Sequence, residues 1–233
     1  MIYLYAFCDA PAAGLDGRTG FAGRPLEALS AGAVSAVFGR IEPPAPPPIP
    51  ENLWLHEEVA ESLMTGPAVL PVRFATTFAD EPALRDVLER HGSRLAPGLD
   101  RVRGLVEIGV RILAPADDDE PATRAVPAAG GRAYLQVRAA EEHRRQSRHA
   151  EVARLGGDLH GQLLPLAREG TFSDQRAPMT AAAYLVPPAA VGQFRGQVEQ
   201  FARRHPGVRV LCTGPWPPYH FAPTIPRDGD NHA

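Results

Sequence analysis

The chain has 233 residues, of which 44% are hydrophobic and 22% are charged, and its net charge is −3 at neutral pH. These values are typical of a globular protein with one large domain or two smaller ones, and the slightly acidic balance argues against nucleic acid as a partner. All 24 basic residues are arginine. A Schiff-base lysine, a pyridoxal site and the lysine of a P-loop are therefore excluded.

Cysteine usage and hydropathy predict where the protein works. Cys8 and Cys212 are the two cysteines of the chain, which gives no disulfide framework and fits a reducing cytosol. The first residues lack the basic start of a signal peptide, and no run reaches the roughly 18–20 apolar residues of a membrane span. A cytoplasmic protein without a membrane span is expected.

In the first half, short apolar runs rich in β-branched and aromatic residues predict strands. These runs are residues 2–7, 33–41, 68–74 and 104–113, and residues 25–30 are a candidate for a further strand. Apolar positions with a helical period predict a helix at 52–65 with Asn52 as its N-cap, one at 80–91 and a second short one at 93–103. Pro71 places its strand at a sheet edge or a bulge.

Residues 114–131 predict a linker, because they combine prolines, four consecutive acidic residues and a glycine pair. Beyond them, the pattern predicts a long helix, two strands, a helix and a final strand. These elements are residues 133–168, 171–176, 180–186, 189–205 and 208–213.

The order of the elements predicts an α+β fold with two ferredoxin-like halves, in which helices pack on one face of a small sheet. The predicted organisation is an N-terminal α+β domain, a linker, a C-terminal α+β domain and an extended C-terminal segment. Their residue ranges are 1–113, 114–131, 132–213 and 214–233.

Three prolines within Gly214–Phe221 fix the backbone and remove donors, which excludes a helix and predicts an extended segment. With about three residues per turn, Trp216 and Tyr219 then lie on the same side. We expect this segment to be ordered, with Trp216 mostly buried against its own protein. Gripping a partner is the alternative.

Motifs that carry known chemistry are absent from the sequence: there is no G-x-S-x-G elbow, no G-x-G-x-x-G loop and no Walker loop. His56-Glu57 resembles the start of a zinc-protease motif, but Ala60 stands where the second histidine belongs. The neighbouring glutamates could raise the pKa of His56 or bind an ion, and a solvated helix face is the favoured interpretation. The sequence predicts no catalytic residue, no metal site and no cofactor, and therefore no enzyme.

Four segments together resemble the GvpL/GvpF family of gas vesicle proteins. They are Tyr3–Phe7, Trp54–Val59 followed by Val69–Thr76, Val106–Val110, and Ala183–Val186 followed by Thr213–Phe221. The last is the most specific, because a Pro-Trp-Pro-Pro-Tyr run is very improbable by chance. The resemblance spans roughly residues 2–223.

One position departs from the family pattern, since Ala75 stands where the family usually has glycine after the arginine-phenylalanine pair. If this position needed a positive φ, alanine would cost about 1 kcal/mol or more. Ordinary strand backbone is the favoured interpretation here.

The resemblance implies a cytoplasmic accessory protein that acts in gas vesicle formation and binds the small hydrophobic shell protein and other accessory proteins. It also implies that the protein can remain in the finished vesicle as a minor component. The candidate residues for partner binding or docking are Arg73, Phe74, Trp216, Pro217 and Tyr219. The alternative is a small-molecule enzyme or sensor on a ferredoxin-like domain, with Arg73 or His56 in a pocket.

Overall fold

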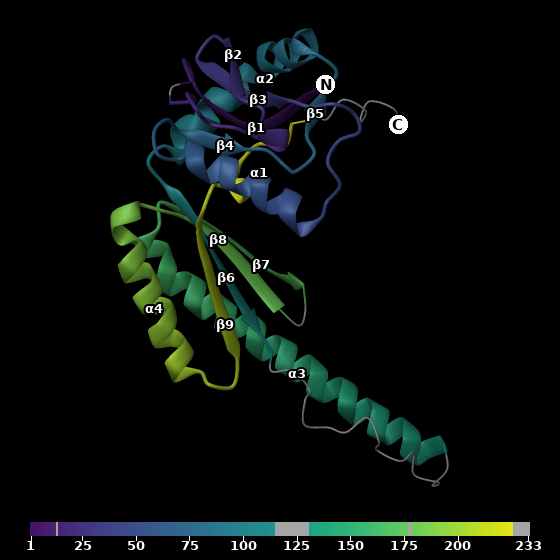
Figure 1. Ribbon diagram of the computed structural model, residues 1–233. Helices are drawn as coiled ribbons and strands as arrows, with labels where there is room; N and C mark the ends of the chain where they lie inside the picture. The colour runs from purple at the N-terminus through teal and green to yellow at the C-terminus, as the bar shows by residue number, and fades with distance from the viewer. Residues whose placement is uncertain (13, 115–130, 177–178, 226–233) are drawn as a thin grey trace. The chain divides into compact units, whose positions relative to one another are not determined.

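The computed structural model describes residues 1–12, 14–114, 131–176 and 179–225. The chain forms two compact units, Met1–Glu107 with Pro215–Ala233, and Ile108–Gly214. It passes from the first unit to the second within strand β6 and returns within strand β9 (Figure 1). Both units combine helices with an antiparallel sheet, so the predicted α+β class is confirmed.

The first unit is built on a five-stranded sheet with the order β2-β3-β1-β4, in which β5 also pairs with β1. The strands are β1 (Ile2–Asp9), β2 (Leu26–Ala31), β3 (Val34–Arg40), β4 (Val69–Pro71) and β5 (Thr77–Phe78), and the helices are α1 (Pro50–Leu63) and α2 (Glu81–Val102). Residues 2–8 of β1 are all buried, so both faces of this strand are covered, with α1 on one side and α2 on the other (Figure 1).

The second unit has a four-stranded sheet with the order β7-β8-β6-β9. Its elements follow the order β-α-β-β-α-β of the ferredoxin-like motif. They are β6 (Val106–Leu113), α3 (Gly131–Leu163), β7 (Glu169–Arg176), β8 (Met179–Val186), α4 (Val191–Arg204) and β9 (Arg209–Trp216).

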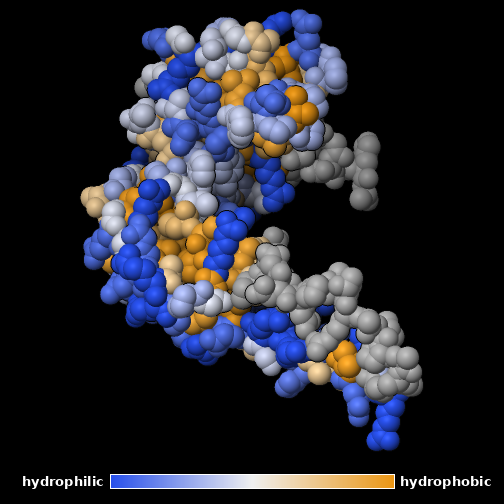
Figure 2. Space-filling view, turned by 60° about the horizontal axis from the view of Figure 1, so that its bottom comes forward, coloured by the Kyte–Doolittle hydropathy of each residue, from blue (hydrophilic) through white to orange (hydrophobic). Residues whose placement is uncertain are grey.

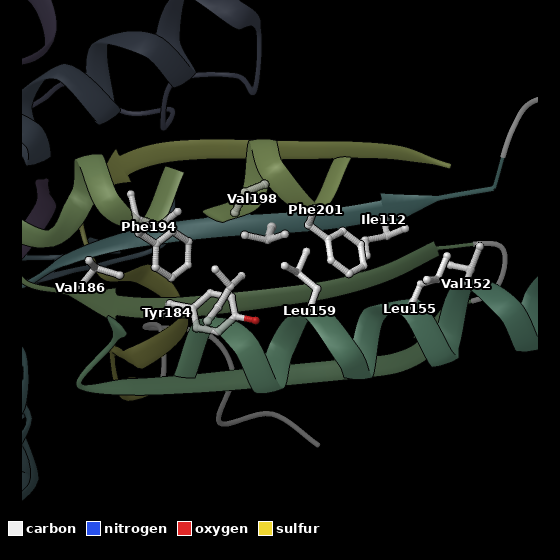
Figure 3. Packing of buried hydrophobic residues seen from close by; sticks show 12 residues of the cluster. Ile112, Val152, Leu155, Leu159, Tyr184, Val186, Phe194, Val198 and Phe201 are labelled. Carbon is white, nitrogen blue, oxygen red and sulfur yellow. The ribbon is translucent and has the colours of Figure 1, made fainter. Parts of the chain in front are cut away.

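One hydrophobic cluster holds the second unit together (Figure 3). Alternate residues of β6 point into it, as a strand with one buried face requires, and they meet apolar stripes of α3 and α4. Its members include Ile108, Val110, Ile112, Val152, Leu155, Leu159, Leu163, Tyr184, Val186, Phe194, Val198 and Phe201.

The N-terminal half of α3 lies outside this core. Residues 134–150 are exposed almost throughout, and Figure 2 shows mainly hydrophilic side chains around this end of the helix. Tyr134, Leu135 and Val137 form a small exposed hydrophobic group there. A helix that is polar on most of its surface takes its stability from its own hydrogen bonds and from the packed half that continues it.

Short 3₁₀ turns complete the structure. They are η1 (Phe21–Gly23), η2 (Leu164–Leu166), η3 (Pro188–Ala190) and η4 (Tyr219–Phe221).

The domain boundary predicted at 114–131 differs from this division, and residues 115–130 lie outside the described residues. β6 was assigned to the first half, but it hydrogen-bonds to β8 and β9 and belongs to the second sheet. The first unit consequently has the order β-β-β-α-β-β-α, which is not the predicted one. Sequence shows that a run is a strand, but it does not show the partner of that strand, because pairing is a long-range property.

Two helix predictions need correction. The helices predicted at 80–91 and 93–103 are one helix, α2, because Leu84, Leu88, Leu95 and Leu99 continue a single buried stripe through Gly92. α1 begins at Pro50 rather than at a cap formed by Asn52. Asn52 lies inside the helix, and its side-chain amide donates to the carbonyl of Pro47 at 2.9 Å.

Ala75 adopts a φ of +62°, so the interpretation of this position as ordinary strand was wrong. This conformation turns the chain between β4 and β5, and the amide of Ala75 donates to the Tyr3 hydroxyl at 3.0 Å. An L-residue in the left-handed region costs about 1–2 kcal/mol. Ala75 is therefore strained in its backbone, and glycine at this position would remove the strain.

Replacement of Ala75 by glycine should raise the free energy of unfolding by about 0.5–1 kcal/mol, because the relieved strain exceeds the larger backbone entropy that glycine has in the unfolded chain. Thermal unfolding measures this change. Ala150→Gly in the exposed part of α3 is the control, and it should destabilise by about 1 kcal/mol. Equal losses in both variants would show that Ala75 is not strained.

Candidate partner-binding surface of the first unit

His56 is the centre of a buried aromatic cluster between α1 and β1. It is 3% exposed because His56, Val59 and Leu63 share the inner face of α1. Its ring lies 5.7 Å from the rings of Tyr3 and Tyr5 and 5.8 Å from that of Phe74, measured between centroids. Phe21 completes the cluster, with its ring 4.8 Å from that of Tyr3.

A chain of hydrogen bonds fixes the protonation of His56. Its Nε2 lies 3.0 Å from the carbonyl of Val72, which can only accept, so Nε2 carries the proton. Nδ1 then accepts from the Tyr3 hydroxyl at 3.1 Å, and the Tyr3 oxygen accepts from the amide of Ala75. Burial lowers the pKa of His56. The expectations that this histidine lies on a solvated face or that the glutamates raise its pKa were wrong.

Arg73 and Phe74 follow β4, the edge strand of the first sheet, and point to different surroundings. Phe74 is half-buried against the aromatic cluster, whereas Arg73 is exposed. Arg73 and Tyr219 line a shallow pocket of about 100 Å³, formed by Pro71–Arg73 and Thr76 on one side and by Tyr219 and Ala222–Ile225 on the other. The structure thus brings two of the predicted site residues together.

The C-terminal segment reaches this pocket by a route that differs from the predicted one. β9 extends to Trp216, Pro217 and Pro218 are buried, and Tyr219–Phe221 form a 3₁₀ turn, so the exclusion of helical backbone was wrong. Trp216 is 39% exposed, and the prediction that it is mostly buried was wrong as well. Prolines remove backbone donors, but a single turn that starts after Pro218 needs only one such donor, the amide of Phe221.

Glu107 fastens the turn to the first unit. This carboxylate is 3% exposed and accepts two hydrogen bonds from His220, at 2.8 Å from the backbone amide and 2.6 Å from Nδ1. Sequence reasoning missed this contact. The available signal was a lone glutamate inside the apolar run of β6, where a buried carboxylate needs partners.

Glu57 and Tyr219 add a second polar pair beside this contact. Burial raises the pKa of Glu57, the Tyr219 hydroxyl lowers it in part, and Glu61 and Glu107 raise it further. Burial is also the main cause of the raised pKa of Tyr219. Within the described part of the chain, however, neither Glu57 Oε1 nor the Tyr219 hydroxyl makes a hydrogen bond of good geometry.

The described residues offer little for catalysis. Burial, with the charge of Asp9, raises the pKa of Cys8 to about 12, so this thiol is protonated at neutral pH. No three His, Cys, Asp or Glu side chains of the described ranges come together as a metal site. The pocket beside Arg73 is also smaller than the roughly 300–1,000 Å³ of small-molecule sites. Nor does any helix in the described ranges have the length and hydrophobicity needed to cross a membrane.

These features describe an α+β protein of two units with a shallow pocket beside the edge strand of the first one. The model of the family described as "Gas vesicle synthesis protein GvpL/GvpF" matches residues 1–223, and the chain belongs to this family.

Curated relatives agree with this family. The chain is 34% identical to gas vesicle protein L of a Streptomyces species, over 91% of this chain and 89% of the relative. It is 30% identical to gas vesicle protein L2 of Halobacterium salinarum, over 77% of this chain and 74% of the relative.

Solved structures share the fold. The crystal structure of GvpF from Microcystis aeruginosa aligns with a TM-score of 0.73 at 20% identity, over 96% of this chain and 99% of that one. GvpF from an Anabaena species aligns with a TM-score of 0.75, also at 20% identity, over 97% of each chain.

Proposed function

We propose that this member of the gas vesicle accessory family binds the small hydrophobic shell protein and other accessory proteins while the vesicle forms in the cytoplasm, and that it acts by binding rather than by catalysis. Family membership over residues 1–223 supports the gas vesicle context. The main structural observation in support of a binding role is the surface where Arg73 and Tyr219 line a shallow pocket beside the edge strand β4.

The geometry of this surface suits an apolar chain segment more than a small molecule. A short edge strand offers backbone groups to an added strand, and the pocket beside it is lined by Pro71, Val72, Pro223 and Ile225 together with the guanidinium of Arg73. A shell protein that tends to associate with itself would present such apolar segments before it is assembled. The binding surface would shield them at this stage.

Deletion of the gene tests the role in the cell. Electron microscopy should show few or no gas vesicles, and expression of the wild-type chain from a plasmid should restore them. Normal numbers of vesicles in the deletion strain would contradict an assembly role.

Arg73→Glu tests the surface. Pull-down of the shell protein by the full chain should weaken by about 10-fold, because the variant replaces a cation that can donate to partner carbonyls by an anion that cannot. The thermal unfolding temperature should not change, since Arg73 is exposed. Arg94→Glu, the same charge change on the exposed face of α2, is the matched control and should leave binding intact. Equal binding by both variants would remove this surface from consideration.

A further inference from the structure

Trp54 lies on the solvent side of α1 and has no role in the core of the first unit. It is 73% exposed. Glu51, Glu58 and Glu61 are also exposed, and their spacing of three and four residues around Trp54 places all four side chains on one face of the helix. The buried face is a different one, formed by His56, Val59, Ala60 and Leu63.

This face costs stability in the free protein. Glu58 and Glu61 are three residues apart on the helix and repel each other, and no ion pair within the described residues neutralises Glu51, Glu58 or Glu61. α1 has no basic residue in its last turn, so Glu61 also faces the negative end of the helix dipole. A large aromatic ring in water adds to this cost. Because these exposed side chains of α1 do not stabilise the free protein, their grouping on one face indicates that the face binds a partner.

The chemistry of the face selects the partner. An indole ring attracts a guanidinium or ammonium group over its surface, and carboxylates on both sides of the ring can accept hydrogen bonds from the same cation. Ile49 and Leu53, which are 46% and 41% exposed, lie to one side of this face and add apolar surface next to it at the start of the helix. Phosphate groups of nucleic acids and anionic lipids would be repelled by the three glutamates.

We propose that the outer face of α1, formed by Glu51, Trp54, Glu58 and Glu61 with Leu53 beside them, is the docking site for a basic amphipathic segment of a partner protein. An arginine or lysine of that segment stacks on Trp54 between the glutamates, and its apolar residues cover Leu53. The inference rests on the proposed function, because a gas vesicle protein is the partner that this face would recruit.

Calorimetric titration of the full chain tests the face itself. The probe is a synthetic amphipathic helical peptide with arginines on one face and leucines on the other, and the control peptide has glutamates in place of the arginines. The basic peptide should bind, and it should bind about 10-fold more weakly to Trp54→Ala and to the double variant Glu58→Arg, Glu61→Arg. The glutamate peptide should not bind.

Two matched variants keep the result specific. Tyr134→Ala removes a different exposed aromatic ring, on α3, which is 48% exposed, and Glu89→Arg reverses an exposed charge on α2. Both should bind the basic peptide like the wild type. No variant should unfold below the wild-type temperature, and the double variant Glu58→Arg, Glu61→Arg should unfold at or above it, because it removes the repulsion between the two glutamates. Equal binding of the basic peptide by Trp54→Ala and the wild type, or no binding by the wild type, would overturn the inference.

Pull-down of the shell protein separates the inference from the proposed function. Loss of binding in Trp54→Ala would support both. Peptide binding through α1 without any capture of the shell protein would leave the docking face and overturn the proposed partner. Capture of the shell protein by the wild type and Trp54→Ala alike, with no peptide binding, would overturn the docking face alone. A self-association that Trp54→Ala abolishes would assign the face to a second copy of this chain and overturn the partner inferred here.

Discussion

Replacement of His56 by alanine should lower the free energy of unfolding of the first unit by about 3–5 kcal/mol. The ring is 3% exposed and fills the space between Tyr3, Tyr5 and Phe74, and loss of a buried ring of this size leaves a cavity with a cost in this range. The variant also leaves the Tyr3 hydroxyl without its acceptor and the Val72 carbonyl without its donor. Chemical denaturation followed by circular dichroism measures the loss.

The pH dependence of stability provides the check on this interpretation. Because the pKa of His56 is lowered from its ordinary value of 6.5 in the fold, the folded state disfavours its protonation. The contribution of neutral His56 is therefore complete above pH 6.5 and is lost as the pH falls below it toward the folded-state pKa. His160 in the second unit is shifted in the same direction, so the comparison is made in a His160→Gln background. His56→Gln should then flatten the acid side of the curve; an unchanged curve would show that His56 is not the buried neutral group.

Local patterns in the sequence predicted most of the secondary structure. Tyr3–Phe7 was recognised as a strand because it is a short, aromatic-rich apolar run, as expected of a strand that is buried on both faces, whereas the stripe through Val191–Arg204 shows a helical period because only one face of that helix is buried. The same reasoning could have placed His56 in the core, since it stands three and seven residues before Val59 and Leu63. The charged neighbours of His56 led instead to the prediction of a solvated face, but these neighbours lie on other faces of the helix.

Features that depend on distant segments could not be predicted in this way. β6 has the composition of a strand in either unit, and only its pairing with β8 and β9 decides between them. The positive φ of Ala75 follows from the path between β4 and β5 and from the hydrogen bond that its amide donates to the Tyr3 hydroxyl, and neither is visible in the local sequence.

The candidate site was predicted only in part. Arg73 and Tyr219 line one pocket as residues of a common surface should, but Phe74 packs against the aromatic core and Trp216 ends β9. Their roles in binding stay a prediction. The composition of the C-terminal segment shows that it has aromatic residues to bury. It does not show which of them is buried, because that depends on where the 3₁₀ turn places each ring.

The second large effect is expected at Phe221, the aromatic residue of the C-terminal segment that is buried, and not at the exposed Trp216. Phe221→Ala should destabilise the first unit by about 3–5 kcal/mol, the range for removal of a buried phenylalanine side chain. Phe221 is 3% exposed, and the guanidinium of Arg101 lies 5.3 Å from the centre of its ring. Trp216→Ala is the matched control. Its side chain is larger but 39% exposed, so its removal should cost about 1 kcal/mol, a typical value for a point mutation.

Hydrogen exchange shows whether the loss comes from this turn. In the wild type, the amide of His220 donates to the buried Glu107 carboxylate and should exchange slowly. Phe221→Ala removes the ring that anchors the turn, so this amide should exchange at least 10-fold faster, while in Trp216→Ala it should keep its protection. Equal losses of stability in both variants, or a His220 amide that stays protected in Phe221→Ala, would show that the C-terminal turn is not part of the core of the first unit. The pocket beside Arg73 would then lack the wall that Tyr219 and Ala222–Ile225 form.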